Sequence, residues 1–225
     1  MFKRYAIYYT PRTGDFAQRG AAWLGWDLQA GIPAAHPAVE NMDIAKLTDR
    51  PRKYGLHGTV KAPFELTKAS TEAQLIAGVA TFCKGQAPVQ LDGLALSQIG
   101  RFLALVPQGD TTALGSLAAT TNVVLDAFRA PLSEAEFTRK NAPHLTDQQR
   151  IYLKNYGYPH IMEYFRFHIT LTGPLASDQL TPVKTALQRY LGTDIPAPFI
   201  IDSLTLCGED ADGRFHKIER FTLGG

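Results

Sequence analysis

Apolar and polar residues alternate along several short stretches of the chain, and each of these stretches is expected to form a strand. Successive side chains of a strand point to opposite sides, so alternation is typical of a strand with one buried face. Residues 3–10 alternate in this way and then meet Pro11, as in a strand that ends at a turn. Further strands are expected at residues 55–61, 91–97, 101–106, 163–173, 199–206 and 215–223. Residues 163–173 show the clearest alternation, and the turns at 98–100 and 212–213 predict two hairpins.

Apolar residues spaced three and four apart predict helices between these strands. Ser70 or Thr71 is expected to cap one of them, and Ser133 with Glu136 has the spacing of a capping box at the start of another. The first helix is expected to stop near Gly31. The predicted helices cover residues 14–30, 70–84, 111–129, a segment from about 133, 147–156 and 177–191.

The order of these elements repeats once along the chain. A strand with a His-x-Thr motif, a helix, a strand, a turn and a strand occur over residues 55–106 and again over 164–223. This order predicts one compact α+β domain, 1–225, with two lobes of antiparallel-rich sheet and flanking helices, related by a pseudo-two-fold axis around a central cleft. Lobe one is expected at about 1–106, a helical insertion at 107–162 and lobe two at 163–225, with exchange of strands between the lobes left open.

Composition narrows the class of protein. The chain has 225 residues, of which 45% are hydrophobic, enough to bury a sizeable core. A net charge of +2 argues against a dedicated binder of long nucleic acid, which normally carries a strongly basic face. The two cysteines, Cys83 and Cys207, lack the spacing of metal or redox motifs and are expected to be buried free thiols. Neither a signal peptide nor a membrane span is recognised, so a cytoplasmic location is expected.

Both His-x-Thr motifs lie on the polar face of an otherwise apolar strand. Residues i and i+2 of a strand share a face, so His57 lies beside Thr59, and His168 lies beside Thr170. By the same parity, Lys61 is expected to follow His57 and Thr59. Arg166 is expected on the face of the second motif. Each strand therefore offers one imidazole, one hydroxyl and a nearby cation.

This set of groups suits the hydrolysis of a phosphodiester. The reaction needs a base to take a proton from water, an acid to protonate the leaving oxygen, and donors for the charged phosphoryl oxygens. Two imidazoles can divide the acid and base roles, hydroxyls can donate to the oxygens, and Lys61, Arg101 or Arg166 can balance the charge. No metal or cofactor is required. Because short motifs recur by chance, the alternative of two structural histidines remains open on this pattern alone.

Five longer stretches resemble one known family. They are Trp23-Leu-Gly-Trp-Asp27, Arg52-Lys-Tyr-Gly-Leu-His-Gly-Thr-Val-Lys-Ala-Pro-Phe64, Gly100-Arg-Phe-Leu-Ala-Leu105, Tyr156-Gly-Tyr-Pro159 and Phe165-Arg-Phe-His-Ile-Thr-Leu-Thr-Gly173. Together they are similar to the 2H phosphoesterase superfamily, and more narrowly to its DUF1045-like branch, which is found with phosphonate-utilisation genes. The resemblance runs over nearly the whole chain.

The resemblance implies a bilobed 2H phosphoesterase fold and metal-free cleavage of cyclic or linear phosphodiesters of a nucleotide or a phosphoribosyl compound. It implies that His57 and His168 are the acid and base pair, and that Thr59 and Thr170 bind the phosphate. The expected partner is a small-molecule phosphodiester, without a membrane, long nucleic acid or an obligate protein partner. A different class of function, a non-catalytic protein that binds a nucleotide or an RNA end in the same cleft, is the alternative.

Other polar and aromatic residues are weaker candidates for substrate contacts. Arg101 opens a predicted strand, and Tyr156 and Tyr158 lie in a loop that leads to the second motif, a place where ligand contacts are common. Tyr54 is expected to pack on the face opposite His57, by its parity in the first motif strand. Lys140 is expected on the solvated face of a helix in the insertion.

Overall fold

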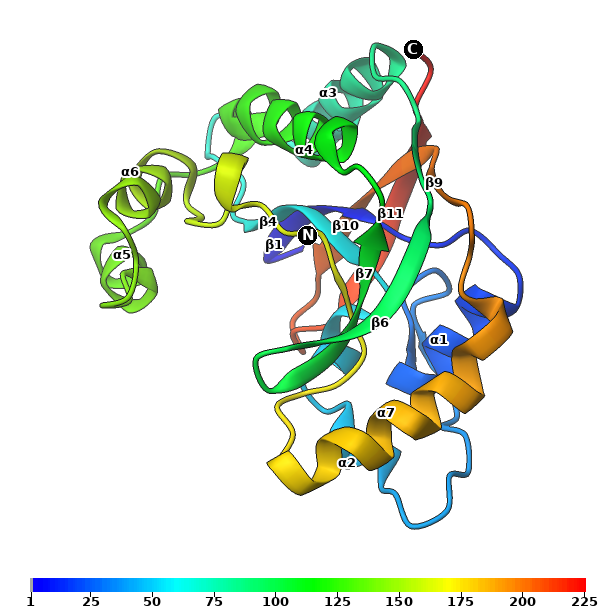
Figure 1. Cartoon of the computed structure of the whole chain (residues 1–225). Coiled ribbons are helices and arrows are strands. Elements are labelled where there is room, and N and C mark those ends of the chain that lie inside the picture. Colours follow the sequence, from blue (N-terminus) through cyan, green and yellow to red (C-terminus); the bar gives the residue numbers. More distant parts are fainter. Residues whose placement is uncertain (1) are drawn as a thin grey trace.

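Antiparallel strands form the centre of the computed structural model, which describes residues 2–225 (Figure 1). The main sheet has seven strands in the order β11-β10-β1-β4-β8-β7-β6, and every neighbouring pair is antiparallel. Its strands are β1 (Arg4–Tyr9), β4 (Gly58–Phe64), β6 (Gly93–Ile99), β7 (Phe102–Gln108), β8 (Ile169–Thr170), β10 (Ser203–Glu209) and β11 (Phe215–Thr222). Outside it, β2 (Trp26–Asp27) pairs with β3 (Ile32–Pro33), and β5 (Val89–Leu91) pairs with β9 (Phe199–Ile201).

The element order repeats as the sequence predicts, except that the strands predicted at 91–97 and 199–206 are each divided into two. The first copy runs β4, α3, β5, β6, β7, and the second runs β8, α7, β9, β10, β11. Each copy sends its last hairpin to the other half of the sheet, because β7 pairs with β8 while β10 joins β4 through β1. The two halves meet where β4 pairs with β8, so the two expected sheets are joined into one. The strands that carry the two motifs are therefore neighbours at the centre of the sheet.

Helices cover the two ends of this sheet. The helices are α1 (Asp15–Leu24), α2 (Ile44–Leu47), α3 (Glu72–Lys84), α4 (Thr112–Val124), α5 (Glu134–Lys140), α6 (Asp147–Tyr156) and α7 (Ser177–Leu191), with 3-10 turns η1 (Pro51–Tyr54), η2 (Leu125–Phe128), η3 (Met162–Tyr164) and η4 (Gly192–Asp194). Helices α3 and α4 pack on the half that contains β4, and α7 packs on β7. Helices α5 and α6 project to one side (Figure 1). The mixed α+β class expected from the sequence is confirmed.

Local sequence explains where these helices begin and end. Thr71 and Ser133 accept hydrogen bonds from the backbone three residues later, so the predicted cap at Ser70 or Thr71 is Thr71, and the predicted capping box at Ser133 is confirmed. The first helix is shorter than the predicted 14–30, because Gly25 ends it in a left-handed conformation with φ of 78°. The chain then turns into β2.

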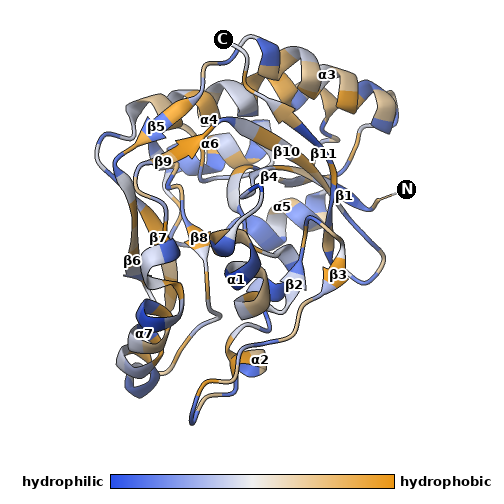
Figure 2. Cartoon of the chain, turned by 90° about the vertical axis from the view of Figure 1, so that its right-hand side faces the viewer, coloured by the Kyte–Doolittle hydropathy of each residue, from blue (hydrophilic) through white to orange (hydrophobic). Residues whose placement is uncertain are grey.

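One apolar core joins the helices to the sheet. It includes Trp23 of α1, Leu75 of α3 and Leu187 of α7, all without exposed surface. Figure 2 shows hydrophobic residues along β8 of the main sheet and along β9, whereas α7 also carries hydrophilic ones. The predicted buried free cysteines, Cys83 and Cys207, are confirmed.

The strand predicted at residues 163–173 is mostly wrong. Only Ile169 and Thr170 form β8, whereas residues 162–164 form the turn η3. The alternation is present, but a strand also needs partners. Within the described residues, β8 pairs with β4 only at Gly58–Ile169, and with β7 only at Ile169 and Thr170. Residues 163–168 are therefore outside both ladders.

Candidate active site

The two His-x-Thr motifs meet at their central residues, where Gly58 of β4 pairs with Ile169 of β8. In an antiparallel pair, residues that flank a matched pair share the opposite face of the sheet. His57 therefore lies next to Thr170, and Thr59 lies next to His168, on one face. The two imidazoles and the two hydroxyls thus form a set with approximate two-fold symmetry about this pair.

Glycine is required at the centre of the first motif because an aromatic ring lies directly beneath it. A methyl group on Gly58 would lie 2.2 Å from the Cζ atom of Phe167, far closer than side-chain atoms approach. Phe167 is itself buried in the core between the motif strands. This packing brings the backbones of the two strands together below the site.

Both motif histidines hold their rings in the same way. Nδ1 of His57 lies 3.0 Å from the carbonyl oxygen of Gly55, and Nδ1 of His168 lies 2.8 Å from that of Arg166. A carbonyl can only accept, so each Nδ1 carries the hydrogen and donates it. Each neutral ring then keeps its lone pair on Nε2. The hydroxyl of Thr59 lies 3.2 Å from Nε2 of His57 and can donate to it.

Aromatic packing makes the environment of His57 strongly apolar. Tyr8 lies against its ring with a centroid separation of 4.1 Å, and Tyr54 lies at 5.6 Å. The pKa of His57 is lowered to about 4, chiefly by this burial and to a smaller extent by the charge of His168, whereas the hydrogen bond to Gly55 acts to raise it. At physiological pH the His57 ring is therefore neutral.

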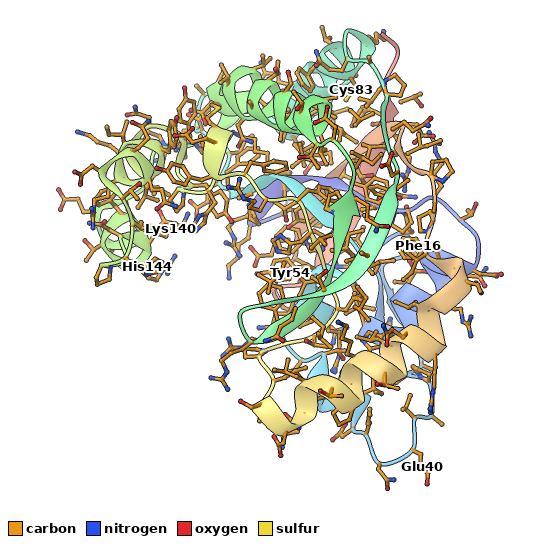
Figure 3. The ribbon with its side chains drawn as sticks, viewed as in Figure 1. Phe16, Glu40, Tyr54, Cys83, Lys140 and His144 are labelled. Carbon is orange, nitrogen blue, oxygen red and sulfur yellow. The ribbon has the colours of Figure 1, made fainter. Side chains whose placement is uncertain are left out.

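A cleft of about 530 Å³ opens over this face of the sheet, large enough for a nucleotide-sized ligand. Its lining residues are Arg4, Tyr8, Arg50, Pro51, Tyr54, His57, Thr59, Ala62, Pro63, Phe102, Lys140, Tyr158, Thr170, Thr172, Gly173 and Pro174. His168 stands beside this lining, because its ring is 5.9 Å from that of Phe102. Figure 3 shows Tyr54 near the middle of the molecule and Lys140 on the projecting α5–α6 segment, and both border the cleft.

Lys61 does not share the face of His57, and the expectation from parity is wrong. Tyr8 pairs with Thr59 but Ile7 pairs with Lys61, so β4 contains an extra residue at Val60. Such a bulge turns the following side chains to the other face. Lys61 is 2% exposed and donates from Nζ to the carbonyl of Asn122 and the carboxylate of Asp126.

The other sequence candidates occupy different places. Arg101 donates to the carbonyl of Leu175, and Arg166 donates to the carbonyls of Glu163 and Phe165. Neither arginine is among the residues that line the cleft, so this geometry adds no support for their predicted substrate contacts.

The two loop tyrosines lie closer to the site. Tyr158 lines the cleft and also a small adjoining cavity, and burial raises the pKa of its hydroxyl. Tyr156 lines only the adjoining cavity. Of the two, Tyr158 is the one placed to meet a ligand in the cleft.

Several lining residues were not predicted from the sequence. Arg4 and Tyr8 share a face of β1 by the same parity rule, so their alternation was the signal that could have found them. Tyr54 lies in the turn η1 and not in a strand, so strand parity placed it on the wrong face. Lys140 is half-buried beside the cleft, and the prediction of a solvated position is wrong.

Over residues 2–225, no group of three or more His, Cys, Asp and Glu side chains is arranged to hold a metal ion. Within the same residues, no helix combines the length and apolarity that crossing a bilayer requires.

The fold is similar to that of solved structures of other proteins. Among solved structures, Escherichia coli LigT complexed with 3'-AMP matches over the whole of both chains with a TM-score of 0.50 and 15% identity. A structure described as a phosphoesterase covers 99% of both chains at 14% identity and a TM-score of 0.48. At these identities the likeness concerns the fold.

Sequence comparison then gives the family. Residues 59–216 match the model of a family described as "Protein of unknown function (DUF1045)", and the chain belongs to this family. A curated relative from Janthinobacterium sp. (strain Marseille), named ribose 1,5-bisphosphate phosphokinase PhnN, is 33% identical over 99% of this chain and 51% of its own length. A relative of the same name from Laribacter hongkongensis (strain HLHK9) is 32% identical over 76% of this chain and 40% of its own. The chain spans about half the length of the curated relatives it matches.

Proposed function

We propose that this protein is a phosphoesterase that hydrolyses a phosphodiester by two-histidine acid and base catalysis. The observation that carries the proposal is the pairing of Gly58 with Ile169, which brings both His-x-Thr motifs to one face of the sheet. Both histidines direct Nδ1 to a backbone carbonyl and keep Nε2 for a proton transfer. Binding alone would not require two rings held in this way.

In the proposed reaction, His57 is the base and His168 is the acid. The neutral ring of His57 takes a proton from water at Nε2, and the water oxygen forms a bond to phosphorus. The bond from phosphorus to the leaving oxygen breaks, and protonated His168 gives its proton to that oxygen. The Thr59 hydroxyl turns from Nε2 of His57 to the substrate, so that Thr59 and Thr170 both donate to the non-bridging oxygens, where charge accumulates. At the end of the reaction His57 has gained one proton and His168 has lost one, and exchange with solvent restores both starting states.

For the substrate we propose a cyclic phosphodiester of a nucleotide or a phosphoribosyl compound, in phosphonate metabolism. LigT was solved with 3'-AMP, so this fold can hold a nucleoside phosphate. The curated relatives are named for a phosphorylated ribose. Their kinase name is not carried over, because this chain contains no G-x-x-x-x-G-K-[ST] phosphate-binding loop. The ligand of the LigT structure and the substrate named for the curated relatives share a phosphorylated ribose.

The test is hydrolysis of a panel of 2',3'-cyclic nucleotides and a cyclic phosphoribosyl compound, with EDTA present. The parent protein is compared with His168→Ala and with His144→Ala, which removes an exposed histidine that does not line the cleft. Turnover by the parent and the control but not by His168→Ala supports the mechanism. Equal turnover by all three proteins refutes it. Binding of the panel without any turnover favours the non-catalytic alternative.

The threonine roles lead to a separate prediction. Thr59→Val and Thr170→Val keep the shape of the side chain and remove the hydroxyl donor. Loss of one such donor to a charged transition state typically costs about 100-fold in kcat. We expect a loss of that order in each variant, with an unchanged melting temperature. A loss below about threefold in both variants would show that the hydroxyls do not contact the phosphoryl oxygens.

A further inference from the structure

Basic side chains that have no role in the two-histidine chemistry lie at one end of the cleft. Arg4 and Lys140 line both the cleft and the small cavity that adjoins it. Arg50 contributes a third cation to the cleft. None of the described residues that line the cleft is an aspartate or a glutamate, whereas Glu65 and Glu136 line the adjoining cavity. The cleft is therefore positively charged beyond the needs of a single phosphodiester, which carries one negative charge.

Two of the three guanidinium nitrogens of Arg4 are held by hydrogen bonds to a carboxylate. Its Nε and Nη2 donate to the two carboxylate oxygens of Glu209 at 2.5 and 2.7 Å, across the matched pair of β1 and β10. Glu209 is 7% exposed, so the carboxylate lies behind the arginine and away from the cleft lining. Within residues 2–225, Nη1 of Arg4 has no hydrogen-bond partner. A guanidinium held in this way is suited to bind an oxyanion.

Lys140 reaches the same end of the cleft from the insertion. Its Nζ donates to the carbonyl of Gly157 at 3.1 Å, which leaves two further hydrogens. Burial lowers the pKa of Lys140, and the nearby charges of Arg4, Arg139 and Arg129 lower it further. These neighbours show that cations converge on Lys140.

The acidic neighbour of Lys140 offsets this repulsion only in part. The charge of Glu136 acts to raise the pKa of Lys140. One oxygen of Glu136, however, already accepts from the backbone and the hydroxyl of Ser133 in the capping box. A bound anion would remove the remaining repulsion between Lys140 and Arg4.

We propose that Arg4 and Lys140, with Tyr158 beside them, form a second anion subsite that holds a phosphomonoester of the substrate. The proposal deepens the proposed function, on which it rests, and names the substrate class: a cyclic phosphodiester that also carries a terminal phosphate. The phosphomonoester carries up to two negative charges, which match the two cations. Because Lys140 and Tyr158 belong to the insertion at 107–162, the insertion supplies one side of this subsite.

The experiment compares two ligands that differ by a single phosphomonoester. The parent protein is titrated calorimetrically with 3'-AMP and with adenosine 3',5'-bisphosphate. A charge-assisted hydrogen bond contributes enough for about tenfold in affinity, so we expect the bisphosphate to bind at least about tenfold more tightly. Lys140→Met should abolish this preference, and Lys140→Arg should retain it.

Arg139 is the matched control for the charge. It is the preceding residue of α5, its side chain is 72% exposed, and it does not line the cleft. Arg139→Met removes the same charge and should retain the preference of the parent.

Three results would overturn the subsite. They are equal affinity of the parent for the two nucleotides, no binding of either nucleotide, or an equal loss of preference in Arg139→Met and Lys140→Met. None of these readouts needs turnover. A parent that prefers the bisphosphate but hydrolyses no member of the cyclic panel would refute the proposed function while the subsite stands.

Discussion

The half-buried imidazole of His57 makes a quantitative prediction about stability at acidic pH. Its pKa is about 4 in the folded protein, chiefly because of burial, and about 6.5 in an unfolded chain. Between these values the unfolded state binds more protons, so the free energy of unfolding falls as the pH falls. The contribution is fully present above about pH 6.5 and is lost progressively towards pH 4.

The magnitude follows from the size of the shift. A pH of 5.0 is about 1.5 units below the pKa of the imidazole in the unfolded chain, and each unit corresponds to about 1.36 kcal/mol. His57 therefore lowers the free energy of unfolding by about 2 kcal/mol at pH 5.0 relative to pH 7.5. The ring borders an open cleft, so water relieves part of the desolvation and this value is an upper limit.

The assay is urea unfolding of the parent and of His57→Gln at pH 7.5 and pH 5.0. Other groups titrate in both proteins, so the informative quantity is the difference between the two pH-dependent losses. We expect the parent to lose about 1 to 2 kcal/mol more than the variant. Equal losses in the two proteins, or a larger loss in the variant, would refute the burial of a neutral His57.

Three further measurements test other parts of the structure. Gly58→Ala should lower the free energy of unfolding by about 1–3 kcal/mol, because the added methyl group overpacks the site. Gly115→Ala, in an open part of α4, should raise it by up to about 1 kcal/mol. A change of the same sign in both variants would contradict the packing beneath Gly58. Lys61→Met should destabilise the fold by about 1–3 kcal/mol, because Asp126 loses a buried partner. The variant should leave KM unchanged, and a raised KM would place Lys61 at the ligand. If His57 is the base, kcat/KM should hold down to about pH 5, and an acidic limb near 6.5 would contradict that role.

The sequence alone determined the local features of this protein. Capping boxes at Thr71 and Ser133 depend on residues three positions apart, and alternation around His57 and His168 depends on residues two apart. The repeated element order also followed from these local patterns. All of these depend on steric and hydrogen-bonding preferences within a few residues, which a sequence displays directly.

The tertiary structure decided which of these residues share a site. The bulge at Val60, which lies in the pairing of β4 with β1, turns Lys61 away from the cleft. Likewise, Arg4 and Lys140 are 136 positions apart and meet only because the insertion folds back over the start of the chain. Register and convergence arise from contacts between distant segments. The spacing of residues along a single chain contains no direct record of those contacts.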